Sequence, residues 1–528
     1  MKGPLRDSKR IKDSALKLLE HQIQTAGAAL DWDQCIHLLG KVLELNPRSA
    51  NAHLQIGKIH GMRYEYDEAM DWFEKAVEVS PRTQHALVLI EAGKMARDFY
   101  DPAISESFYD EALEVARNNV GRDAMADAVD AKIALAEHSI RSRKRELARS
   151  LVDEVLGANA KDEEALLLWC RLNEDQFDCC VARLEQLLRS EASGELKVKV
   201  SYQLAKMLDR AGDYDGAMEV LLLAKASMMS ARNPIVTHRR KIRGEFKELA
   251  EAFTKSKRAE WQAASLDFGP PKNLALLGGH PRSGTTLLEQ VLDAHPGVVS
   301  AEETENLHIF SFLPLLKKYS PLTRVLEVMN ACSTEDLIGA REKYWESMER
   351  CLQEPVGSRL LLDKNPSLTP LAPEFFRFFP ETKYVIMIRD PRDVIVSCFM
   401  QPFFPPNAVS GNFLTLEDTA AEVGEFMGIW ADLSNRFDGN VCEVRYEDMV
   451  ENLEGNARKV LDFLGLGWNE SVMDYDRHAS EKVVRSPTAD AVTEKVHSRA
   501  KNRWRNYEKH LGPVLDTLAP CLKKLGYD

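Results

Sequence analysis

The pattern of apolar and polar positions divides the chain into two regions. From residue 1 to about residue 230, apolar residues recur at helical spacing, and strand signals are almost absent. From Leu274 onward, short apolar runs alternate with amphipathic helical patterns, which is typical of an α/β domain with a mainly parallel sheet. The sequence therefore predicts a helical region followed by an α/β domain.

The helical region contains an internal repeat. Pro47 and Pro81 lie 34 residues apart, and each ends an apolar helical stretch. Small and large residues recur at intervals of 12, 4 and 3 in three places: Gly57, Ala69, Phe73 and Ala76; Ala136, Ala148, Val152 and Val155; Ala205, Ala217, Leu221 and Ala224. The pattern resembles tetratricopeptide repeats, five or six in number, with irregular copies near residues 84–120 and 165–195. The alternative is an unrelated helical bundle.

A stack of such hairpins forms a solenoid with a concave face. We expect this face to bind a protein or peptide and to do no chemistry. A purely structural or dimerising role is the alternative, and the oligomeric state stays open.

A basic connector is predicted at residues 231–272. The segment from Ser230 to Pro234 interrupts the helical pattern, and His238–Arg243 opens a helix expected to run to about Ser265. Gly269-Pro270-Pro271 ends the connector, so the predicted domains are 1–230, 231–272 and 273–528. A basic run of this kind is usually a solvated helix face, and a partner site is the lesser alternative.

Each predicted strand of the α/β domain is followed by a polar cluster. The strands are Leu274–Leu277, Leu360–Leu362, Tyr384–Ile388 and Val441–Val444. Ligands bind beyond the carboxyl ends of parallel strands, so the four clusters can face one site.

The turn after the first strand has the composition of an anion site. Gly284 lets a ligand approach the backbone, Arg282 supplies guanidinium donors, and Ser283, Thr285 and Thr286 supply hydroxyls at a predicted helix start. The turn resembles the nucleotide P-loop, but Thr285 stands where that motif has its lysine, which disfavours a magnesium-dependent kinase. The alternative is an ordinary strand-to-helix turn.

Composition excludes some classes of protein and sets expectations for others. The net charge of −13 and pI near 5.6 argue against a general nucleic-acid binder. Nine cysteines without a CxxC pair fit reduced thiols, and there is no signal-peptide core or long apolar run, so we expect a cytoplasmic protein with no membrane span. No metal-ligand spacing is present, and we expect no metal.

The motifs HPRSGTT, DKNP, YVIMIRDPRDVIVS and VRYEDM, in this order, resemble the sulfotransferase family. The segments PRSGTTLLEQVLDAHP and EET are similar to tyrosylprotein sulfotransferases and to bacterial relatives that carry tetratricopeptide repeats. The resemblance covers about residues 273–528. It implies a P-loop-like α/β domain that transfers a sulfuryl group from 3′-phosphoadenosine 5′-phosphosulfate (PAPS) to an acceptor hydroxyl.

The resemblance also implies roles for single residues. Glu303 would be the catalytic base, with Glu302 as its rival, and Lys364 would stabilise the transition state. Arg282 and Ser283 would serve the leaving group. The residues implied to hold the nucleotide are Arg282, Ser283, Gly284, Thr285 and Thr286 at the 5′ side, Arg389 and Ser397 at the 3′-phosphate, Tyr446 nearby, and Thr488 and Lys495 in a C-terminal clamp.

Plainer roles stay open for the same residues. Arg389 could pair with Asp390 or Asp393, Lys364 could pair with Asp363, Glu303 could be a solvated glutamate, and Tyr446 could be an ordinary half-buried aromatic residue.

The chain departs from the tyrosylprotein pattern at Gln401, Glu305 and Glu494, where those enzymes carry Arg, Arg and Lys. The acceptor therefore stays open. Protein tyrosine is the first expectation, and a saccharide or small-molecule hydroxyl follows. The same departures motivate the alternative of a catalytically inactive repeat scaffold that keeps a nucleotide-binding domain.

Overall fold

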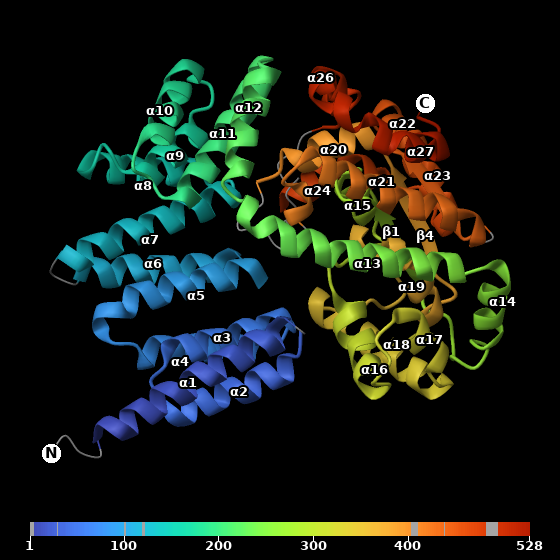
Figure 1. Ribbon diagram of the computed structural model, residues 1–528, viewed down its shortest axis with the longest axis horizontal. Coiled ribbons are helices and arrows are strands. Elements are labelled where there is room, and N and C mark those ends of the chain that lie inside the picture. The colour runs from blue at the N-terminus through green and yellow to red at the C-terminus, as the bar shows by residue number, and fades with distance from the viewer. Residues whose placement is uncertain are drawn as a thin grey trace. The chain divides into compact units, whose positions relative to one another are not determined.

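The computed structural model describes residues 5–28, 30–99, 102–118, 122–402, 410–437, 439–481 and 495–527. The chain divides into two compact units, Met1–Arg183 and Leu184–Asp528. Figure 1 shows the elements of each unit. This division falls earlier than residue 230, where the repeat pattern was expected to end.

The first unit consists of antiparallel helix pairs, as the repeat pattern predicts. Its helices are α1 (Leu5–Ala28), α2 (Trp32–Leu45), α3 (Ala50–Met62), α4 (Tyr66–Val79), α5 (His85–Phe99), α6 (Pro102–Asn118), α7 (Arg122–Arg141), α8 (Arg145–Ala158) and α9 (Glu163–Leu172), and α10 (Phe177–Arg189) crosses the boundary. The small repeat positions allow close packing, since a Cβ on Gly57 would lie 2.6 Å from the Phe73 ring. The N-terminal region is therefore a stack of tetratricopeptide-repeat hairpins.

One copy expected to be irregular keeps the repeat spacing. Gly93, Ser105, Tyr109 and Ala112 follow the same intervals of 12, 4 and 3. A Cβ on Gly93 would lie 2.7 Å from the Tyr109 ring, and the Ser105 hydroxyl donates to the Gly93 carbonyl at 2.8 Å. Serine and tyrosine replace the usual small and large residues here, which hid the repeat from the sequence pattern.

The second unit is built on a five-stranded parallel sheet of order β2-β3-β1-β4-β5. Its strands are β1 (Leu274–Gly279), β2 (Val298–Ser300), β3 (Leu360–Lys364), β4 (Lys383–Ile388) and β5 (Val441–Arg445). The four predicted strands are confirmed, and every strand ends at the same edge.

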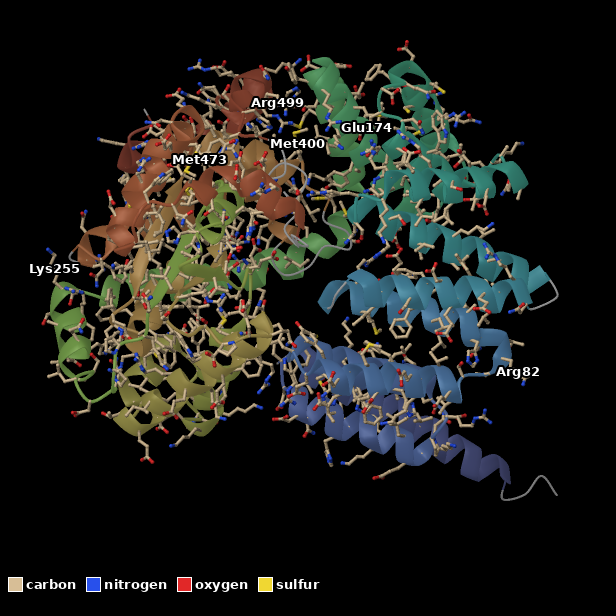
Figure 2. The ribbon with its side chains drawn as sticks, turned by 180° about the vertical axis from the view of Figure 1, so that it is seen from behind. Arg82, Glu174, Lys255, Met400, Met473 and Arg499 are labelled. Atoms are coloured by element: carbon tan, nitrogen blue, oxygen red, sulfur yellow. The ribbon has the colours of Figure 1, made fainter. Side chains whose placement is uncertain are left out.

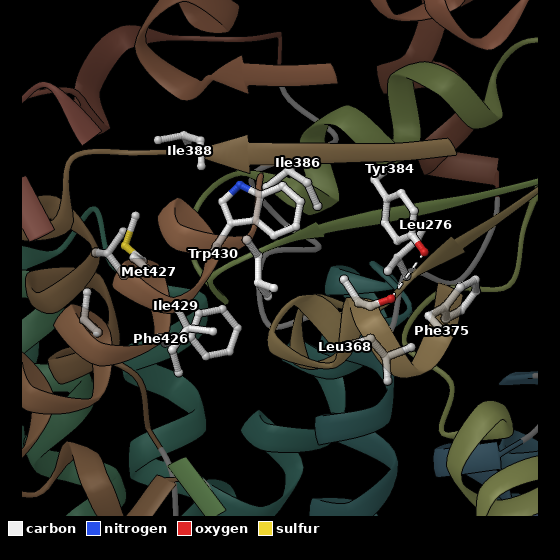
Figure 3. Close-up of a cluster of buried hydrophobic side chains, with 14 of the residues drawn as sticks. Leu276, Leu368, Phe375, Tyr384, Ile386, Ile388, Phe426, Met427, Ile429 and Trp430 are labelled. Carbon is white, nitrogen blue, oxygen red and sulfur yellow. Dashed lines mark hydrogen bonds between the residues drawn. The ribbon is translucent and has the colours of Figure 1, made fainter. Parts of the chain in front are cut away.

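Both faces of the sheet are buried. Alternate residues belong to two separate cores, because successive side chains of a strand point to opposite faces. Figure 3 shows part of one core, where Leu276, Tyr384 and Ile386 of the sheet pack near Phe375 and Trp430. Burial on both faces explains why the strands read as continuous apolar runs.

The helices of the second unit cover these faces. They are α11 (Gly194–Ala211), α12 (Tyr214–Ala226), α13 (Arg232–Ala252), α14 (Lys255–Ala263), α15 (Thr285–Asp293), α16 (Leu313–Lys318), α17 (Val325–Ala331), α18 (Thr334–Leu352), α19 (Ala372–Phe378), α20 (Pro391–Phe399), α21 (Leu416–Leu433), α22 (Tyr446–Glu451), α23 (Leu453–Leu464), α24 (Tyr475–Glu481), α26 (Glu508–Leu511) and α27 (Leu515–Leu525). The last repeat hairpin, α11–α12, shares a core with the α/β domain through Tyr202, Met218 and Leu221. This shared core explains the early unit boundary.

The connector differs from its prediction in three respects. The helix expected to open at His238 begins earlier, because α13 starts at Arg232 and includes Pro234. The helical stretch breaks after α13, where Thr254 caps the separate helix α14. The basic run is a solvated face only in part: His238, Arg240 and Lys241 are exposed, as expected. Arg243 is instead buried and pairs with Glu422 and Glu425 of α21. The ion pairs of Arg243 therefore hold α13 against α21 of the α/β domain.

None of the nine cysteines forms a disulfide bond. Within the described ranges, no helix combines the length and the apolar character needed to cross a membrane.

Candidate functional site

The turn between β1 and α15 forms a cradle. Gly284 has a φ of +98° and precedes α15, which begins without a side-chain cap. The Gly279 N–H donates to the Thr369 hydroxyl at 2.7 Å, which fixes the start of the turn. An uncapped helix start leaves backbone N–H groups available to an anion.

The half-buried Arg282 and the buried Arg389 meet beside this turn. Arg282 Nε donates to the Ser397 hydroxyl at 3.1 Å, and Arg389 Nη1 donates to the Arg282 carbonyl at 2.8 Å. Burial lowers the pKa of Arg282, and the positive charge of Arg389 lowers it further. The Arg389 guanidinium also lies 4.5 Å from the centre of the Tyr446 ring. The structure thus brings together the arginines, serine and tyrosine that the sequence motifs singled out.

The cradle has the hydrogen-bond donors that an anionic group such as a phosphate requires. Among the described residues, the buried Ser283 hydroxyl and Arg389 Nε have no hydrogen-bond partner. Buried polar atoms are rarely left unpaired in proteins, so such atoms are suited to a ligand. Thr285 and Thr286 are buried at the first two positions of α15, beside these donors.

Arg389 does not pair with Asp390 or Asp393, the plainer alternative. Asp390 pairs with Arg392 at 2.8 Å, and Asp393 accepts the backbone N–H groups of Asn502 and Trp504, both at 2.8 Å.

Lys364, the last residue of β3, lies between two carboxylates. Lys364 Nζ is 2.7 Å from Glu303 Oε1 and 3.3 Å from Glu289 Oε2. Burial by itself lowers the pKa of Lys364, but the charges of Glu289 and Glu303 outweigh it and raise the pKa. The Glu303 side chain is 49% exposed, so an acceptor can reach it.

Asp363 does not pair with Lys364. It accepts the Tyr344 hydroxyl at 2.7 Å, and burial raises its pKa to about 7. Asn365 Nδ2 donates to the Thr304 carbonyl at 2.5 Å, which ties the end of β3 to the loop that carries Glu303. Glu302, in the same loop, has a φ of +57°.

The C-terminal segment closes one side of the cradle. Arg389 Nη2 donates to the Ala500 carbonyl at 2.6 Å, and Arg503 Nη2 donates to the Met400 sulfur at 2.9 Å. Figure 2 labels Met400 and Arg499. The predicted clamp residue Thr488 lies outside the described residues. Lys495 is exposed, and no contact of Lys495 with Arg389 is found in the described part of the chain.

Two hollows, of about 610 and 450 Å³, lie beside β5 and are lined in part by Asn435, Glu443 and Lys459. None of the predicted site residues lines either hollow. Within the described ranges, no group of three or more histidine, cysteine or acidic side chains could hold a metal ion.

Sequence reasoning missed Glu289 and Thr369. Glu289 occupies a helical position that looks like a surface site, yet it is fully buried. Thr369 lies 90 residues from the turn that it fixes, in the 3₁₀ segment Pro366–Leu371. No local signal marks either residue.

Comparison with known families agrees with this geometry. Residues 275–470 match the model of the sulfotransferase family, and residues 22–82 match a tetratricopeptide-repeat model. The chain therefore joins tetratricopeptide-repeat helices to a sulfotransferase-family domain.

Among individual proteins, an uncharacterized protein of Aquifex aeolicus is 27% identical over 65% of this chain and 44% of its own length. Protein-tyrosine sulfotransferase 2 of Gallus gallus is 27% identical over 48% of this chain and 69% of its own length. The chain thus spans less than half of the first relative. A solved structure, the sulfotransferase domain of the Synechococcus PCC 7002 olefin synthase, is 20% identical, with a TM-score of 0.33, over 49% of this chain and 96% of that one.

Proposed function

We propose that this protein is a PAPS-dependent sulfotransferase that transfers a sulfuryl group to an acceptor hydroxyl. The observation that carries the proposal is the pair of neighbouring arginines, the half-buried Arg282 and the buried Arg389, beside an uncapped helix start and unpaired buried donors. Two guanidinium groups held this close favour an anionic ligand between or beside them.

The residues then have distinct tasks. PAPS, when bound, would supply the sulfuryl group and leave adenosine 3′,5′-bisphosphate. The turn from Arg282 to Thr286 holds the 5′ side, and Arg389 and Ser397 hold the 3′-phosphate. Glu303 removes the proton of the acceptor hydroxyl, and Lys364 provides positive charge beside it.

The test is binding of adenosine 3′,5′-bisphosphate by calorimetry, followed by turnover of labelled PAPS with host extract. Arg282→Ala should weaken nucleotide binding at least tenfold, about the loss of one charge-assisted contact. The Arg189→Ala variant, which changes an arginine of α10 whose side chain is 77% exposed, is the matched control and should bind within about twofold. A well-folded protein that binds no nucleotide would overturn the proposal.

Label from PAPS also identifies the acceptor class, by entering protein, glycan or small molecules. Protein tyrosine is the first candidate, supported by the protein-tyrosine sulfotransferase relatives. We further propose that the repeat helices bind a protein or peptide partner and that the protein is cytoplasmic. An inactive scaffold is the second candidate; it would bind the nucleotide tightly yet label no acceptor.

A further inference from the structure

We propose that Glu289 is a positioning residue: it is the permanent counterion that holds Lys364 in place while Glu303 is neutralised by the acceptor's proton. This inference rests on the proposed function. Glu289 Oε2 lies 3.3 Å from Lys364 Nζ, and the two side chains are 0% and 1% exposed.

The two carboxylates in contact with Lys364, Glu303 and Glu289, differ in their exposure and in how firmly they are held. Glu303 lies in the loop after β2 and is 49% exposed, so it can change partners. Glu289 lies on α15, and its Oε1 accepts the Ser300 hydroxyl at 2.6 Å. Three elements, α15, β2 and β3, thus fix Glu289 and Lys364 relative to one another. Of the two carboxylates in contact with Lys364, Glu303 is the exposed one.

Lys364 needs a counterion throughout the reaction. Its burial favours the neutral amine, and an uncompensated buried ammonium would lose its proton or move. The other charged groups that act on it are the carboxylates of Glu302 and Glu303 and the neighbouring Asp363. Asp363 is turned to Tyr344, so it does not replace Glu303.

Glu303 loses its negative charge when it acts as the base and takes the proton of the acceptor hydroxyl. When Glu303 has taken the acceptor's proton it is neutral, and Glu289 is then the carboxylate still in contact with Lys364. Lys364 therefore remains an ammonium when positive charge beside the reacting groups is most useful. Glu289 itself exchanges no proton and contacts no reacting atom.

The direct test is carbon NMR of the full-length protein with ¹³Cε-labelled lysine. The Lys364 signal is assigned by its loss in Lys364→Arg. Glu303→Gln mimics the protonated base, and in this variant Lys364 should stay charged through pH 9.5. Adding Glu289→Gln should lower the Lys364 midpoint by about one to three pH units, the usual effect of losing a neighbouring opposite charge.

Two outcomes overturn the inference: Glu303→Gln alone discharges Lys364, or the added Glu289→Gln leaves its titration unchanged. The single variants keep the test independent of how well the double variant folds. Glu289→Gln must lower the Lys364 midpoint more than Ser300→Ala does, because Ser300→Ala removes the hydrogen bond to Glu289 but leaves its charge.

Turnover gives a second readout. The alkaline limb of the pH profile of kcat should move to lower pH in Glu289→Gln, while the affinity for adenosine 3′,5′-bisphosphate stays within about twofold of the native value. An unmoved alkaline limb would also overturn the inference. If no acceptor is ever sulfated, the proposed function fails, and the NMR titration still decides whether Glu289 is the counterion.

Discussion

Replacing Gly284 by alanine should disrupt the nucleotide cradle through the Tyr446 ring. A Cβ at this position would lie 2.6 Å from Tyr446 Cδ2 and 3.3 Å from Met387 Cε. The residue also has a φ of +98°, which costs a non-glycine residue about 1–2 kcal/mol. The crowding adds about 1–3 kcal/mol, so the variant should lose roughly 2–5 kcal/mol of unfolding free energy.

Gly284→Ala should also weaken nucleotide binding, because the Arg389 guanidinium stacks on the Tyr446 ring that the new methyl group would displace. We expect at least about a tenfold loss of affinity for adenosine 3′,5′-bisphosphate, measured by calorimetry on protein shown to be folded.

Two other glycines with positive φ provide matched controls. A Cβ on Gly357, at φ +62°, meets nothing within 4 Å, so Gly357→Ala should cost only the strain of about 1–2 kcal/mol and leave binding unchanged. A Cβ on Gly279, at φ +130°, would lie 2.4 Å from the Met387 carbonyl oxygen, and this backbone atom cannot swing aside as a ring can. Urea unfolding should rank the losses Gly357 < Gly284 < Gly279. Native affinity in Gly284→Ala, or a different ranking, would refute the reasoning.

Three further predictions concern single side chains of the second unit. Glu303→Gln should keep nucleotide affinity within a few-fold and reduce turnover by roughly two to four orders of magnitude; near-native turnover would exclude Glu303 as the base. Burial lowers the pKa of Lys225 to about 7 from an ordinary 10.5, so between these values the unfolded chain binds more protons and stability rises with pH. In urea unfolding, the unfolding free energy of the native protein minus that of Lys225→Met should rise by roughly 2–3 kcal/mol between pH 7 and pH 9. A difference that does not change with pH would contradict this prediction. Asp393→Asn should speed amide exchange of the segment around Trp504 about tenfold or more, measured by mass spectrometry, because the anionic acceptor of two N–H groups is lost. Burial raises the pKa of Asp393 to about 6, so amide exchange of the same segment in the native protein should also speed up, relative to the intrinsic rate, as the pH falls through that value. Exchange that changes neither in Asp393→Asn nor with pH would contradict the prediction.

The sequence by itself determined the two-region architecture, the parallel strands and the common edge of the polar clusters. These features follow from local periodicity, because a strand buried on both faces reads as an apolar run and a repeat hairpin needs small residues at its contact. The same reasoning identified the turn from Arg282 to Thr286, since its residues are adjacent in the chain.

Only the tertiary structure decided which groups meet. Lys364 and Glu289 are 75 residues apart, and a helical glutamate has no local mark that separates a buried counterion from a surface charge. In the basic run of α13, no local mark separates Arg243, which is buried against α21, from its exposed neighbours Arg240 and Lys241. Long-range charge pairing depends on which elements pack together, and that packing is fixed by the whole core rather than by a local pattern.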